Sequence, residues 1–101
     1  MLEMVVRGKF PQPVDRDVVE KSWSERGYDC HDFNDAPGQE WNGFEHSMNE
    51  LVTIVEGELK LEIEGKICTA GPGDEVFIPR DTVHSVKNIH NGRTRWLFGY
   101  D

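Results

Sequence analysis

The residues best suited to chemistry begin with a histidine and a glutamate four positions apart, His46 and Glu50. Glu50 opens the apolar run ELVTIV, and a carboxylate at the mouth of a buried strand is unfavourable unless something pairs with it. On one continuous strand the two residues would lie roughly 13 Å apart, too far to share a metal ion bound at about 2.1 Å. Ser47 and Asn49 lie between them and are common in turns, so the sequence permits a hairpin that brings imidazole and carboxylate together.

A second histidine of interest, His84, lies in the segment PRDTVHSVKN. Pro79 and Asp81 are suited to a turn that precedes a strand. In that strand the period of two places His84, Val86 and Asn88 on one face. If this face is the interior of a barrel, the imidazole needs a partner, and either a carboxylate or a metal ion supplies one.

The elements that must position these residues are predicted to be short strands. Strand-like segments separated by turn residues recur from Tyr28 onward at about the spacing of 8–12 residues that a sandwich or small barrel shows. They cover residues 28–33, 41–46, 50–55, 58–66, 67–70, 75–79, 82–89 and 94–100. The Asn-Gly pair in HNGR predicts a hairpin before the last segment. In ELVTIV the alternation places Glu50, Val52 and Ile54 inward and Leu51, Thr53 and Val55 outward.

The N-terminal part is predicted to differ from the rest. Residues 15–26 space their apolar side chains as a helix does, with Asp15 as the N-cap and Gly27 after the end. Before them, Leu2, Met4 and Val6 alternate weakly, which suggests a strand that could pair with another chain.

Length and composition limit the class of protein. The 101 residues allow one domain, and ten glycines and five prolines favour many short elements, so we expect an all-β fold. The formal charge of −8 opposes binding to nucleic acid or to anionic lipid. No segment has the roughly 18 apolar residues of a membrane span, and MLEMVVRGKF is too short and charged for a signal peptide, so we expect a cytoplasmic protein. Cys30 and Cys68 are interpreted as small buried hydrophobic residues.

Two motifs make the chain resemble the cupin family of small jelly-roll β-barrels. The first cupin motif, G-x5-H-x-H-x3or4-E-x6-G, matches residues 38–57 in every gap, and the second, G-x5-P-x-G-x2-H-x3-N, matches residues 73–88. The chain departs from the pattern at two positions. Phe44 stands where the family has its first histidine ligand, and Asp81 replaces a turn glycine. The resemblance implies a single cupin domain over residues 1–101, built from two antiparallel sheets.

The resemblance also implies the site. With Phe44 in place of one ligand, His46, Glu50 and His84 remain as candidate metal ligands, and a fourth from Glu40 or Gln39 is disfavoured. Two imidazoles and a carboxylate suit Fe, Mn or Zn, and also Ni or Cu. An alternative stays open, in which both histidines bond Glu50 directly in a metal-free network.

Several functions are compatible with this family. The chain is expected to bind a small oxygenated molecule, such as a keto acid, diketone or sugar, as a metal-dependent oxygenase, isomerase or lyase. The alternatives are a non-catalytic sensor module and a metal-free isomerase or epimerase with a histidine base. The resemblance further implies a homodimer. Six aromatic residues are interpreted either as core or interface, or as the wall of a ligand cavity: Trp41, Phe44, Phe77, Trp96, Phe98 and Tyr100.

Overall fold

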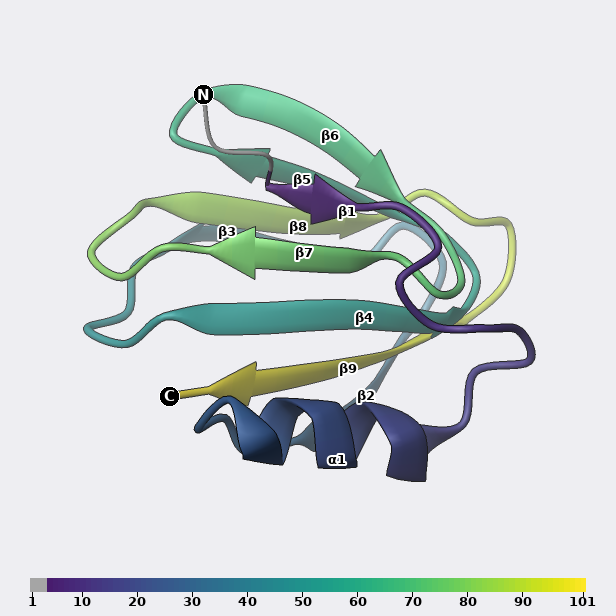
Figure 1. The fold of residues 1–101 in the computed structure, drawn as a ribbon. Coiled ribbons are helices and arrows are strands. Elements are labelled where there is room, and N and C mark those ends of the chain that lie inside the picture. Colours follow the sequence, from purple (N-terminus) through teal and green to yellow (C-terminus); the bar gives the residue numbers. More distant parts are fainter. Residues whose placement is uncertain (1–3) are drawn as a thin grey trace.

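The computed structural model describes residues 4–101, and Leu2 of the predicted N-terminal strand lies outside them. The elements are β1 (Val5–Val6), α1 (Arg16–Glu25), β2 (His31–Asp35), β3 (Glu40–Phe44), β4 (Glu50–Glu56), β5 (Leu59–Ile63), β6 (Lys66–Ala70), β7 (Glu75–Ile78), β8 (His84–Asn88) and β9 (Thr94–Tyr100). Figure 1 shows the strands stacked across the molecule, with the helix beside β9 and β2.

The strands form two sheets whose ladders are antiparallel throughout. One sheet has the order β1-β7-β4-β9-β2 and the other the order β3-β8-β5-β6. The predicted all-β jelly roll with two antiparallel sheets is therefore confirmed. The two strands that carry the candidate ligands Glu50 and His84 are central in their sheets, because β4 lies between β7 and β9 and β8 lies between β3 and β5.

Two of the predicted hairpins are wrong. The turn between His46 and Glu50 connects β3 to β4, which belong to different sheets, and HNGR likewise connects β8 to β9 across the sheets. A crossing loop needs the same turn-forming residues as a hairpin, so composition alone does not separate the two. The turn between His46 and Glu50 exists as expected, but it bridges the layers.

The interior between the sheets follows the predicted alternation. Val52 and Ile54 of β4 are fully buried there, and β5 adds Leu59, Leu61 and Ile63. The buried side chain of Asn88 connects several segments by hydrogen bonds at one end of this interior. The Nδ2 atom of Asn88 donates to the carbonyl oxygens of Asp35, Ala36 and Gly92, and its Oδ1 accepts from His90 N and, at 2.6 Å, from Thr94 Oγ1.

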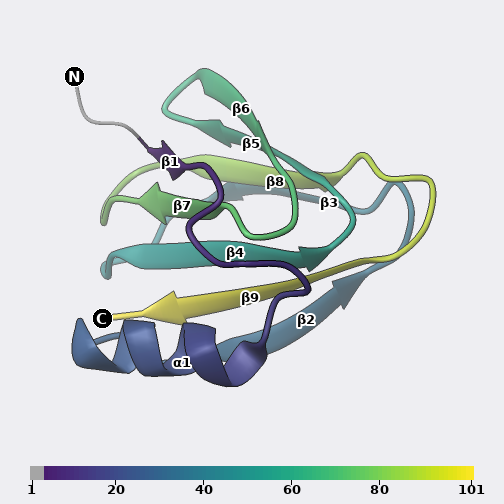
Figure 2. The same cartoon turned by 45° about the vertical axis from the view of Figure 1, so that its right-hand side comes forward.

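The predicted helix is confirmed as α1, and the side chain of Asp15 caps it by accepting from Asp17 N. Val19 and Trp23 of the helix are fully buried against Leu51 and Leu97, on the outer face of the five-stranded sheet (Figure 2). This packing explains why ELVTIV is apolar on both faces. The outward face of β4 is covered by the chain's own helix, so the pattern gives no support to a dimer interface at that position.

Among residues 4–101, no helix is both long enough and apolar enough to cross a membrane.

Candidate metal centre

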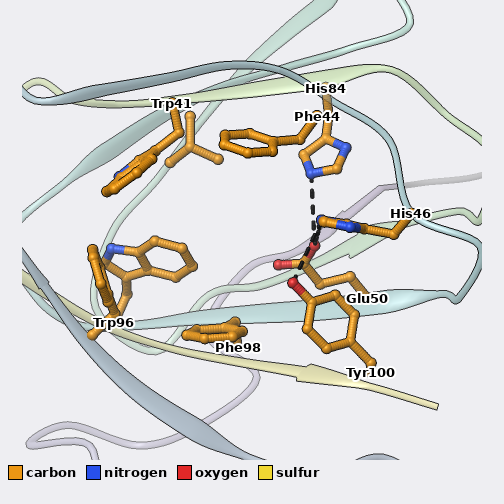
Figure 3. A pocket seen from close by; sticks show the side chains of 10 residues that line it. Trp41, Phe44, His46, Glu50, His84, Trp96, Phe98 and Tyr100 are labelled. Carbon is orange, nitrogen blue, oxygen red and sulfur yellow. Dashed lines mark hydrogen bonds and ion pairs between the residues drawn. The ribbon is translucent and has the colours of Figure 1, made fainter.

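A cavity of about 200 Å³ lies between the two sheets (Figure 3). Its wall is formed by Phe33, Trp41, Phe44, His46, Glu50, His84, Val86, Trp96, Phe98 and Tyr100. The predicted aromatic set therefore lines a cavity with one exception, Phe77, which packs on the outer face near the helix. A bulge in β3 between Trp41 and Phe44 adds one residue to the strand, and both side chains consequently reach the same cavity.

Glu50, the first residue of β4, lies at one end of this cavity with 4% of its surface exposed. Its Oε1 atom is 3.6 Å from Nε2 of His46 and 3.6 Å from Nε2 of His84. Both separations exceed the length of a direct hydrogen bond, and Oε1 has no hydrogen-bond partner among the described residues. Burial raises the pKa of the Glu50 carboxyl to about 7, because the charged form has lost its hydration.

His84, the first residue of β8, is held in one orientation by a hydrogen bond to the backbone just before its strand. Its Nδ1 atom lies 3.1 Å from the carbonyl oxygen of Thr82, a contact that requires the proton on Nδ1. The lone pair of Nε2 then faces Glu50 Oε1, so two acceptors oppose each other. In metal-binding histidines, a backbone carbonyl that accepts a hydrogen bond from one ring nitrogen fixes the ring, and the other nitrogen binds the metal.

His46 lies in the loop between β3 and β4, and its carbonyl oxygen accepts from Asp81 N at 2.7 Å. Asp81 has φ +57°, which confirms that aspartate takes the turn conformation of the missing glycine. Burial, and secondarily the neighbouring His84, lower the pKa of His46. The ring is therefore neutral at neutral pH and has a lone pair available for a metal ion.

The loop that carries His46 is clamped at Asn49. The backbone N–H of Asn49 donates to Asp101 Oδ1 at 3.0 Å, and its Nδ2 donates to Asp101 Oδ2 at 2.9 Å. Its side-chain oxygen accepts from Arg80 N at 2.9 Å. Three separate segments are joined in this way, so the distance from His46 to Glu50 is set by the fold rather than by a free loop.

The three predicted ligands are thus brought together. One ligand atom of each residue lies within 4.8 Å of the corresponding atoms of the others. Atoms bound at about 2.1 Å to one ion, at tetrahedral or octahedral angles, lie about 3.0–3.4 Å apart. The observed 3.6 Å separations are slightly wider, and a small inward movement of these side chains reaches coordination distance. The buried, unpartnered Oε1 atom shows that the residues present fit a cation.

Phe44 and Tyr100 complete the surroundings. The Phe44 ring centroid lies 6.2 Å from that of His46 and 6.3 Å from that of His84, so apolar surface occupies the position of the absent histidine. The hydroxyl of Tyr100 lies 3.4 Å from His46 Nε2. Burial and the nearby Glu50 raise the pKa of Tyr100 to about 12, which keeps it a hydrogen-bond donor. Tyr100 was predicted as a possible residue of a cavity wall, but no sequence pattern indicates its contact with His46.

The other residues considered from the sequence lie elsewhere. Glu40 pairs with Lys87, Gln39 accepts from Ala36 N, and His90 is exposed. The His31 ring lies 5.2 Å from that of Phe98 in a tilted arrangement, and His31 pairs with Asp29 at 3.2 Å, whereas Cys30 packs with the outer cluster.

The comparison with family models finds the cupin domain family (Cupin_2) over residues 32–100. Because the match covers most of the chain and includes all three clustered residues, the chain belongs to the cupin family. No curated protein matches the sequence.

Solved cupin structures share the fold at low sequence identity. A cupin 2 domain-containing protein from Halorhodospira halophila has a TM-score of 0.68 at 19% identity, over 73% of this chain and 52% of that one. The Cnp3 cupin domain of Schizosaccharomyces pombe has a TM-score of 0.68 at 15% identity, over 72% and 54%. An oxalate oxidase solved with the substrate analogue glycolate has a TM-score of 0.67 at 20% identity, over 74% and 42%. The chain thus spans about half of the first two structures.

Proposed function

We propose that this cupin binds one divalent metal ion through His46, Glu50 and His84 and binds or acts on a small oxygenated molecule beside it. The observation that carries the proposal is the Oε1 atom of Glu50, which is buried, lacks a hydrogen-bond partner in the described part of the chain, and lies 3.6 Å from two imidazole nitrogens. An unpaired buried carboxylate is costly, and a divalent ion would remove that cost.

The donor set limits which ion is expected. Two imidazoles and one carboxylate suit Fe, Mn or Zn, with Ni and Cu as further possibilities. When bound, the ion would supply Lewis-acid or redox chemistry to an oxygen atom of the substrate. The three ligands would leave positions for that oxygen. The Tyr100 hydroxyl, which lies 3.4 Å from His46 Nε2, would donate a hydrogen bond to it once the ion occupies the lone pair of that nitrogen.

A metal-free function is the second candidate, and one observation favours it. Because burial raises the pKa of Glu50 to about 7, a proton on Glu50 can satisfy the site in place of a metal ion. The chain would then be a binding module, or an isomerase that uses a histidine as base.

Elemental analysis of untagged protein, purified without chelators, distinguishes these functions. The proposal expects about one metal ion per chain and loss of that metal in His46→Ala. Protein that stays without metal after soaking with Fe, Mn, Ni, Cu and Zn would contradict it. Thermal-shift and turnover assays with keto acids, diketones and sugars then separate an enzyme from a sensor, because a sensor is stabilised by its ligand without consuming it.

A further inference from the structure

A second buried carboxylate lies at the opposite end of the cavity. Asp35, the last residue of β2, has none of its surface exposed. Its Oδ1 accepts from Trp41 Nε1 at 2.9 Å, and its Oδ2 accepts from Trp96 Nε1 at 2.9 Å. The two tryptophans come from β3 and β9, which belong to different sheets. Figure 3 shows both indoles across the cavity from Glu50 and the histidines.

These hydrogen bonds determine what the far end offers to a ligand. An indole has a single donor, and here both donors are used by Asp35. Phe33 packs edge-on against both rings, with centroids 5.6 Å from Trp41 and 5.7 Å from Trp96, and Phe98 lies 5.4 Å from Trp96. The side chains that line this end therefore present aromatic faces and edges, without a free hydrogen-bonding group.

We propose that the substrate has an oxygenated head, which binds beside Glu50, and a flat aromatic body, which lies against Trp41 and Trp96. The position of the head rests on the proposed function, while that of the body rests on Asp35 and the two indoles. A sugar is disfavoured because its hydroxyl groups would lose hydrogen bonds at this end. The cavity of about 200 Å³ is smaller than most drug-sized pockets, so one ring is the expected size. Asp35 is a positioning residue that fixes both indoles.

Two acids that share one head test this inference. Benzoylformate and pyruvate both carry an α-keto acid, but their bodies are a phenyl ring and a methyl group. We expect metal-loaded protein to bind benzoylformate at least about tenfold more tightly by calorimetry. Quenching of tryptophan fluorescence should accompany binding. Metal content is measured separately on the same samples.

Variants then assign the selectivity to the indoles. An asparagine at position 35 has only one acceptor oxygen, so Asp35→Asn should free one indole and lower the benzoylformate-to-pyruvate ratio severalfold, with metal content and pyruvate affinity retained. Trp41→Leu should have the same effect if Asp35→Asn does not fold. Trp23→Phe is the matched control, because Trp23 belongs to α1 and packs on the outer face of the five-stranded sheet, and the ratio should stay unchanged.

The possible outcomes separate this inference from the proposed function. Equal affinity for the two acids in metal-loaded protein, or binding of neither, would overturn the aromatic substrate and leave the metal site standing. A high ratio that survives Trp41→Leu would overturn the role of the indoles. A high ratio in protein that takes up no metal after soaking would support the aromatic body while contradicting the proposed function.

Discussion

The Nε2 atom of His84 lies 3.6 Å from Oε1 of Glu50, while Nδ1 of the same ring lies 3.1 Å from the carbonyl oxygen of Thr82. Because Nδ1 keeps the ring proton and donates it to this carbonyl, Nε2 of the neutral ring and Oε1 are two acceptors that face each other across a buried gap. The gap is satisfied by a proton, on Oε1 or on Nε2, or by a metal ion.

Replacing His84 should remove the metal ion. His84→Ala deletes a proposed ligand whose ring is already oriented, and we expect the metal affinity to fall by more than about 100-fold. Competition with a chelating dye and elemental analysis measure this. His31→Ala is the control, since His31 is exposed and pairs with Asp29 away from the cluster, and it should retain full occupancy. Unchanged occupancy in His84→Ala would contradict the proposed ligand set.

Restoring the imidazole that the family has at position 44 should strengthen metal binding. The Phe44 ring lies 6.2 Å and 6.3 Å from the rings of His46 and His84, so an imidazole there is close enough to turn toward the same ion. We expect Phe44→His to raise the affinity at least about tenfold. Phe44→Leu adds no ligand and should leave it unchanged. If both variants bind alike, position 44 lies outside coordinating range.

The stability of metal-free protein should fall as pH rises from about 4.5 to about 7, because of Glu50. Burial raises the pKa of Glu50 from 4.5 to about 7, so below pH 4.5 the group is protonated in both folded and unfolded states. Above about pH 7 the folded state alone bears the cost of a buried charge, which lowers the free energy of unfolding by about 3 kcal/mol. Urea denaturation at pH 5 and pH 8 should show this decline. Glu50→Gln should lack it, and an equal decline in both proteins would assign it to another group.

Metal binding should show the opposite dependence on pH. A divalent ion competes with the proton for Glu50, so the affinity should decrease as pH falls below about 7 and level off above it. Titration with Zn²⁺ or Mn²⁺ in buffers of matched ionic strength measures the curve. An affinity that is flat from pH 6 to pH 8 would exclude Glu50 as a ligand.

The three clustered residues were predicted from the cupin motifs together with the local pattern. The period of two along β4 and β8 fixes which side chains enter the barrel, and the turn before Glu50 allows His46 to approach it. The pairing of the strands was harder to predict, because the turn residues at 47–49 and 90–93 suit a hairpin and a loop between the two sheets equally well.

Contacts between distant positions could not be predicted. Asp35 lies in NDAPG, a cluster typical of a turn, and nothing near it indicates that its carboxylate joins Trp41 to Trp96, which lies 61 positions after Asp35. Tyr100 reaches His46 from 54 positions away. The outward apolar face of β4 likewise has its explanation in α1, which no strand periodicity can reveal.

Asn88 should be among the most sensitive positions for stability. It is 1% exposed, donates to three carbonyl oxygens and accepts from His90 N and Thr94 Oγ1. Asn88→Ala leaves several buried polar groups unpaired, and we expect a loss of about 2–4 kcal/mol, measured by urea denaturation. Asn42→Ala, whose side chain is exposed, is the control and should cost less than about 0.5 kcal/mol. A small effect at Asn88 would mean that water replaces its bonds.

The chain is predicted to form a homodimer, and the sheet edges are where we expect the contact. β1 and β6 each pair with one strand only, and they expose Val6 (46%) and Ile67 (64%). Such edges favour pairing with a second chain.

Light scattering and native mass spectrometry at micromolar concentration should show a dimer, and Ile67→Lys should shift it toward monomer, since a charge there would be buried. Val18→Lys, at an exposed position of α1, should leave the dimer intact. A wild-type chain that is only monomeric would refute the prediction, and a dimer broken by Val18→Lys instead would move the interface to the helix.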